Sequence, residues 1–95
     1  MNKSHYKVSE LIANTRKILE LSFQKIWVDG EVSNLHYHSS DHIYFTLKDS
    51  LAEVRCAMFK KSASSLRFKL EEGMHVVVYG SVSVFEARGQ LQFIV

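Results

Sequence analysis

Two stretches of alternating apolar and polar residues, 43–48 and 53–59, flank a short polar segment and predict a β-hairpin. Side chains of a strand alternate between its two faces, so every second residue shares a face. The apolar rows are Ile43, Phe45 and Leu47 in the first strand and Val54, Cys56 and Met58 in the second. We therefore expect one face of this hairpin to lie in the core.

Three more strands are predicted, at residues 26–35, 74–85 and 90–95, with a turn at 86–89. Gly30 and Gly80 interrupt the two longer strands. A glycine inside a strand is typical of a bulge or a sharp bend. We therefore expect these two strands to bend at their glycines.

An apolar stripe at helical spacing predicts a helix from about Glu10 to Ser22, with Ser9 as its N-cap residue, after a polar leader at 1–7. Three charged residues are expected on its solvent-facing side: Arg16, Lys17 and Glu20. We expect this helix to pack across one end of a barrel or to present a surface to a following domain.

A short helix after residue 59 is indicated by the spacing of Ala63, Leu66 and Leu70, and Gly73 is expected to end it. Five strands with a helix between the third and the fourth are typical of the OB fold. The predicted fold class is all-β with helices: a five-stranded OB-fold Greek-key barrel preceded by an N-terminal α-helix. We expect the leader and helix at 1–24 and the barrel at 25–95.

The net charge is only +2, so total charge offers no argument for nucleic acid. The basic residues are unevenly placed, however. Between residues 55 and 69 the chain has five bases and no acid: Arg55, Lys60, Lys61, Arg67 and Lys69. Such a run is commonly a solvated helix face, and it also suits a surface that neutralises phosphates.

The single cysteine, Cys56, falls in an apolar row, so a disulfide within the chain is impossible and a core position is expected. No apolar run approaches the ~20 residues of a membrane span, and residues 1–10 lack the apolar middle of a signal peptide. We expect a cytoplasmic protein that does not contact a membrane. The apolar last strand suggests a fragment of a longer chain.

The outward row of the hairpin combines aromatic, hydroxyl and basic side chains: Tyr44, Thr46, Lys48, Arg55 and Phe59. In an OB barrel this face and its neighbouring loops bind oligonucleotides or oligosaccharides. An exposed ring can stack on a base, and lysine or arginine can neutralise phosphate. The alternative is that Tyr44 and Phe59 cover a second small core.

Three histidines, His36, His38 and His42, precede the hairpin. They could ligate zinc, but no cysteine is nearby and loop spacing fixes no geometry, so polar loop residues are expected. The four glycines are isolated, which excludes a glycine-rich phosphate loop, and no pair of acids is placed to share a cleft with a nucleophile. We expect no metal, no cofactor and no catalytic residue in this segment.

Five blocks of sequence resemble, in their order, the N-terminal OB-fold domain of the large subunit of bacterial exodeoxyribonuclease VII. They are VSELIANTRKILELSF, IWVDGEVSNL, SSDHIYFTLKD, AEVRCAMFKK and EEGMHVVVYGSVSVFEARGQLQFIV. The resemblance extends from about Tyr6 to Val95. It implies a module that binds single-stranded DNA within an enzyme that degrades single-stranded DNA to oligonucleotides without depending on a divalent metal.

The resemblance also implies that catalytic residues lie in a downstream domain and that several small subunits join the large one through that region. The residues implied to contact DNA are Tyr44, Thr46, Lys48, Arg55, Ser39, Ser40, His42 and Arg88. Lys60 and Lys61 of the basic run are added to this set.

The chain departs from the family pattern at Asp41, where glycine is common, and at Ala87, where proline is common. An acid at Asp41 is expected to repel phosphate slightly, and the loss of proline is expected to loosen the last turn. Two other functions stay open: a barrel that docks the rest of its own chain or a partner subunit, and an anticodon-type OB domain that reads RNA.

Overall fold

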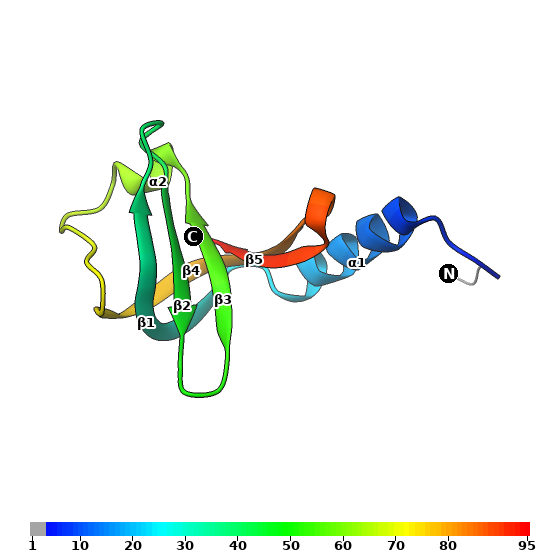
Figure 1. Cartoon of the computed structure of the whole chain (residues 1–95), viewed down its shortest axis with the longest axis horizontal. Coiled ribbons are helices and arrows are strands. Elements are labelled where there is room, and N and C mark those ends of the chain that lie inside the picture. The colour runs from blue at the N-terminus through cyan, green and yellow to red at the C-terminus, as the bar shows by residue number, and fades with distance from the viewer. Residues whose placement is uncertain (1–3) are drawn as a thin grey trace.

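The computed structural model describes residues 4–95, which form an N-terminal helix followed by a closed five-stranded barrel (Figure 1). The predicted fold class is confirmed, and the first three residues of the predicted leader lie outside the described residues. In chain order the elements are α1 (Val8–Ser22), β1 (Ile26–Tyr37), β2 (Ile43–Lys48), β3 (Glu53–Met58), α2 (Lys60–Ala63), β4 (His75–Phe85), the 3₁₀ turn η1 (Glu86–Arg88) and β5 (Gln90–Ile94).

The hydrogen-bonded order of the strands is β1-β2-β3-β5-β4, and the barrel closes because β4 also pairs with β1. The β3–β5 pair is parallel, and the other four pairs are antiparallel. The predicted hairpin is the β2–β3 pair, which lies between β1 and β5.

Gly30 and Gly80 lie where β1 and β4 change partners. β4 pairs with β1 up to Gly80 and with β5 from Ser81 onward. A Cβ atom on Gly80 would lie 2.0 Å from the carbonyl oxygen of Ile94, and one on Gly30 would lie 2.9 Å from that of Lys48. Glycine therefore lets a neighbouring strand approach closely at both points.

The bulge in β1 is not at Gly30, where the sequence allowed one. The β1–β2 register shifts between Ser33 and His36, and Asn34 within that interval has a φ of 49°. Asparagine tolerates this left-handed conformation better than most residues. The irregularity thus lies around Asn34, four residues after Gly30, and the Asn34 side chain is exposed.

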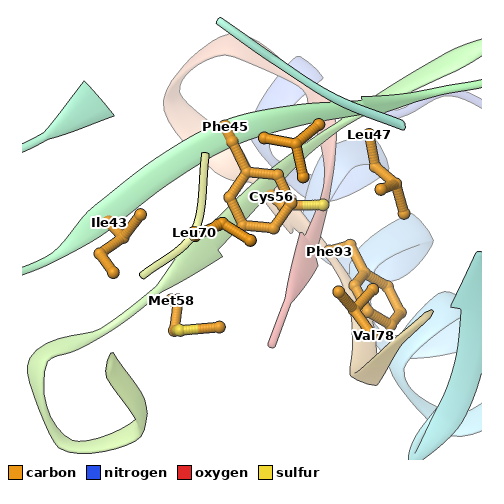
Figure 2. Close-up of a cluster of buried hydrophobic side chains, with 9 residues drawn as sticks. Ile43, Phe45, Leu47, Cys56, Met58, Leu70, Val78 and Phe93 are labelled. Carbon is orange, nitrogen blue, oxygen red and sulfur yellow. The ribbon is translucent and has the colours of Figure 1, made fainter. Parts of the chain in front are cut away.

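The core fills the barrel with the apolar rows of the hairpin, joined by residues from the other strands and by Leu70 of the segment before β4 (Figure 2). Its buried members are Val32, Ile43, Phe45, Leu47, Cys56, Met58, Leu70, Val78 and Phe93. The predicted inward rows of β2 and β3 are confirmed, with Val54 only half-buried. Ala57, expected on the outward row, is also buried, because its small side chain lies between those of Tyr44 and Ile94 on the adjacent strands.

Helix α1 begins at Val8 with Lys7 at its N-cap, so the predicted N-cap at Ser9 is wrong. The carboxylate of Glu10 accepts the backbone N–H of Lys7 at 2.9 Å. An acid three residues after the cap satisfies the cap's amide. This bond explains why the helix starts two residues earlier than expected.

The charged side of α1 faces the β4–β5 hairpin, and Figure 1 shows the helix lying beside this extended end of the molecule. Arg16 donates to Glu20 at 2.9 Å and also pairs with Glu86 of η1, while the Ser83 hydroxyl donates to Glu20 at 2.7 Å. Arg16 and Glu20 are solvent-accessible, as expected, and they also bond to this hairpin. The exposed apolar residues of the helix are Val8, Leu11, Ile18 and Leu21.

Helix α2 confirms the predicted short helix but ends at Ala63, earlier than the spacing indicated. The hydroxyl groups of Ser64 and Ser65 donate to the carbonyl oxygens of Lys61 and Ser62, at 2.9 and 3.0 Å. Serine side chains that bond to the backbone compete with helix continuation. Within residues 4–95, neither helix has the length and apolar character needed to cross a membrane.

Candidate nucleic-acid interface

The outward row of β2 and β3 forms the centre of the candidate interface. Tyr44 is 36% exposed, Arg55 is exposed, and Lys48 is half-buried. Thr46 lies opposite Arg55 in the register and is only 7% exposed, so it can contribute no more than its hydroxyl at the bottom of the surface. Phe59 is 43% exposed. Neither Tyr44 nor Phe59 is buried, which disfavours the alternative of a second core beneath them.

A hollow of about 260 Å³ opens in this row and is lined by Asn34, Tyr44, Thr46 and Arg55, together with parts of Phe45 and Cys56. Asn34 reaches it from the β1 bulge, where its backbone is left-handed. The hollow therefore combines an aromatic ring, a hydroxyl, an amide and a guanidinium group. Sequence reasoning missed Asn34, because a bulge breaks the alternation from which outward residues were assigned.

A second, wide-open hollow adjoins the first and is lined by Arg55, Arg88, Gly89 and Gln90. Arg55 thus borders both hollows, which joins the strand face to the β4–β5 turn. Glu86, two residues before Arg88, is paired with Arg16 of α1. The structure brings Arg88 beside Arg55 on the predicted surface even though the two residues lie far apart in sequence.

The loop from His38 to His42 is a tight turn. The Asp41 N–H donates to the His38 carbonyl, and the His38 N–H donates to the His42 carbonyl, both at 2.9 Å. Asp41 has a φ of 70°, the left-handed region that favours glycine. This conformation is a physical reason for the glycine that the family commonly has there. Ser39 and Ser40 are exposed on the same turn.

His42 links this loop to the basic run. Its Nδ1 accepts the backbone N–H of Lys60 at 2.8 Å, at the start of α2. The Lys60 ammonium group also lies 3.9 Å from the Asp41 carboxylate. The acid expected to repel phosphate therefore has a lysine beside it, and Lys60 and the exposed Lys61 adjoin the hairpin.

The three histidines do not gather around a common point. Within residues 4–95, no group of three or more histidine, cysteine or acidic side chains is arranged to hold a metal ion. His38 instead contacts Ser40, with its Nδ1 2.7 Å from the serine hydroxyl. His38 and His42 form hydrogen bonds that order the loop, whereas His36 lies in β1 and contacts the His38 ring.

The β1–β4 face carries different chemistry. Trp27 and Tyr79 lie across from each other with ring centroids 4.7 Å apart, and they are 69% and 44% exposed. Asp29 and Glu31 share this face, and Asp29 lies 3.5 Å from His75. Two carboxylates beside the rings disfavour phosphate, so the β2–β3 face is the better candidate.

A closed five-stranded barrel with a ring, an amide and two arginines around adjoining hollows defines an oligonucleotide-binding class of OB domain. The chain belongs to the family of OB-fold nucleic acid binding domains, whose family model matches residues 6–95.

The chain is also similar to proteins named exodeoxyribonuclease 7 large subunit. The protein from Geotalea uraniireducens is 52% identical over 88 residues, which cover 93% of this chain and 20% of that protein. The one from Pseudomonas savastanoi pv. phaseolicola is 53% identical over 87 residues, which cover 92% of this chain and 19% of that protein. The predicted resemblance is confirmed, and the chain spans about a fifth of the length of the curated relatives it matches.

Proposed function

We propose that this chain is the single-stranded DNA-binding module of a bacterial exonuclease that degrades single-stranded DNA to oligonucleotides. The observation that carries the proposal is the pair of hollows that share Arg55. They bring together a ring, an amide, a hydroxyl and two guanidinium groups, and such groups can stack on bases, form hydrogen bonds and bind phosphate. The name of the relatives supports DNA as the ligand and a nuclease as the whole protein.

The proposed roles follow from the position of each side chain. Tyr44 stacks on a base, while Asn34 and Thr46 offer hydrogen bonds at the bottom of the hollow. The proposed phosphate contacts are Lys48, Arg55, Arg88, Lys60 and Lys61. Ser39, Ser40 and His42 are proposed to border the path of the strand where it passes the loop.

In the full-length protein, we place catalysis in the part of the chain outside these 95 residues. We also place there the contacts with the small subunits of the enzyme. The proposed substrate of the assembly is single-stranded DNA, and its proposed location is the cytoplasm.

Binding to a fluorescent dT oligomer at several salt concentrations tests the proposal. Tyr44→Ala removes a stacking contact worth roughly 1–3 kcal/mol. Arg55→Ala removes a phosphate contact and is expected to flatten the slope of log K against log salt by about 0.7. The double variant is expected to bind at least about tenfold more weakly, whereas Lys17→Ala on the exposed side of α1 should bind like the wild type. Unchanged affinity of the double variant would show that this surface is not the site.

The same assay with RNA of identical sequence tests the anticodon-type alternative. Our proposal predicts tighter binding of DNA. Tighter binding of RNA would assign the surface to RNA instead.

The apolar stripe of α1 favours a second function, the docking of other parts of the full-length protein. Leu11, Ile18 and Leu21 lie on one side of the helix and are 52%, 64% and 74% exposed. Since the chain spans about a fifth of its relatives, the proposed occupant of the stripe is the remainder of the full-length polypeptide.

A further inference from the structure

Five aromatic rings follow one another at the end of the β2–β3 hairpin that lies opposite its turn. Their spatial order is His36, His38, Tyr44, His42 and Phe59. Successive ring centroids are 5.8, 6.0, 6.3 and 5.3 Å apart. The planes of neighbouring rings are inclined by 60° to 87°, an edge-to-face arrangement. We call these five residues the ring row. It extends from the end of β1, through the loop and β2, to the residue after β3.

Two rings of the row are held in place by hydrogen bonds. The His38 Nδ1 accepts the N–H of Ser40 at 3.1 Å, and the His42 Nδ1 accepts the N–H of Lys60 at 2.8 Å. Edge-to-face contacts steady their neighbours. Rings that are already ordered lose little conformational freedom when a ligand binds.

Four of the five rings are accessible, and His42 is half-buried. His36 and His38 are exposed, and Tyr44 and Phe59 are 36% and 43% exposed. Lys60 follows Phe59 directly, so a positive charge lies beside one end of the row. Aromatic faces next to a cation are the combination that binds unpaired bases together with their phosphates.

We infer that the ring row is a stacking track for unpaired bases, which extends the proposed DNA site beyond Tyr44 to His36 at one end and Phe59 at the other. The inference rests on the proposed function, because the track and the hollows would hold the same strand. Bases in a duplex already stack on one another, so the track accepts unpaired bases and discriminates against paired ones. His36 and His38 gain a role that their chain positions did not indicate, and Phe59 keeps the stacking role that the outward row suggested.

The test compares a dT oligomer with an oligomer of equal phosphate number whose bases are replaced by abasic tetrahydrofuran sites. The wild-type chain is expected to bind the dT oligomer at least about tenfold more tightly. Phe59→Leu keeps an apolar side chain but removes the ring, and His36→Ala removes the other end of the row. Each is expected to weaken dT binding about fivefold to tenfold and to leave abasic binding and the salt slope unchanged.

Phe68→Leu is the matched control, because Phe68 is an exposed phenylalanine that lines a separate hollow with Trp27 and Tyr79. It should bind both oligomers like the wild type, and melting curves should show that every variant is folded. Equal binding of the dT and abasic oligomers by the wild type would overturn the track. The track would also be overturned if folded Phe59→Leu and His36→Ala variants kept the wild-type preference for dT. Either result would leave the proposed function standing. Failure of the wild type to bind either oligomer would overturn both.

Discussion

At the residue scale, strand alternation predicts which side chains point outward, but their neighbours decide how exposed those side chains are. Tyr44 and Arg55 were assigned to the outward row, and they are accessible there. Thr46 belongs to the same row and is nearly buried. Asn34 joins the hollow although the sequence did not indicate it, because the position of a bulge depends on the register with the next strand.

Cys56 carries a prediction at this scale. It is 3% exposed, and burial raises the pKa of its thiol to about 12 because the charged thiolate is disfavoured away from water. At neutral pH the folded chain should therefore hardly react with a thiol reagent such as dithiobisnitrobenzoate. In denaturant the same chain should release one thiol equivalent. Rapid reaction of the folded chain would contradict the burial of Cys56.

At the element scale, α1 is attached to the barrel by two charged residues, Arg16 and Glu20, and by Ile12, which lies against Gly89. Leu19 of the apolar stripe is half-buried, while Leu11, Ile18 and Leu21 are exposed. Sequence periodicity located the helix but assigned its faces by the usual rule that apolar residues point inward. The rule holds for only part of the stripe, because the described contacts of α1 are with β4 and the η1 turn, at the end of the barrel, and these cover one side of the helix.

Glu20 makes this attachment dependent on pH. The Arg16 guanidinium and then the Ser83 hydroxyl, both bonded to the carboxylate, hold the pKa of Glu20 below its usual value. A pKa that is lower in the folded state contributes stability above the unfolded-state pKa, and this stability is lost as the pH falls through the folded-state value. Glu20→Gln should therefore lower the melting temperature near neutral pH but have little effect in acid. Glu71→Gln, an exposed acid on the loop before β4, serves as the control, and equal effects of Glu20→Gln at both pH values would contradict the linkage.

At the scale of the whole molecule, the barrel brings four separate segments to one surface. The β1 bulge, the 38–42 loop, the β2–β3 hairpin and the β4–β5 turn contribute to it. The division into a leader and helix at 1–24 and a barrel at 25–95 remains a proposal. Arg16 and Glu20 bond to the β4–β5 end of the barrel, and Ile12 lies against Gly89 at the same end.

The proposed docking of α1 gives a prediction at this scale. Leu11→Ser combined with Ile18→Ser changes two exposed side chains, so the melting temperature of the 95-residue chain should hardly move. In the full-length protein, where the stripe is proposed to be covered, the same pair should lower it by several degrees. Equal behaviour of the two proteins would contradict docking through α1.

The sequence alone determined the hairpin, the inward rows of β2 and β3 and the OB class, because period-two alternation is a local property. Only the tertiary structure decided which outward residues are accessible, where β1 bulges, which side of α1 is attached and how five rings align. These features depend on contacts between segments far apart in the chain, and such contacts leave no periodic signal in either segment.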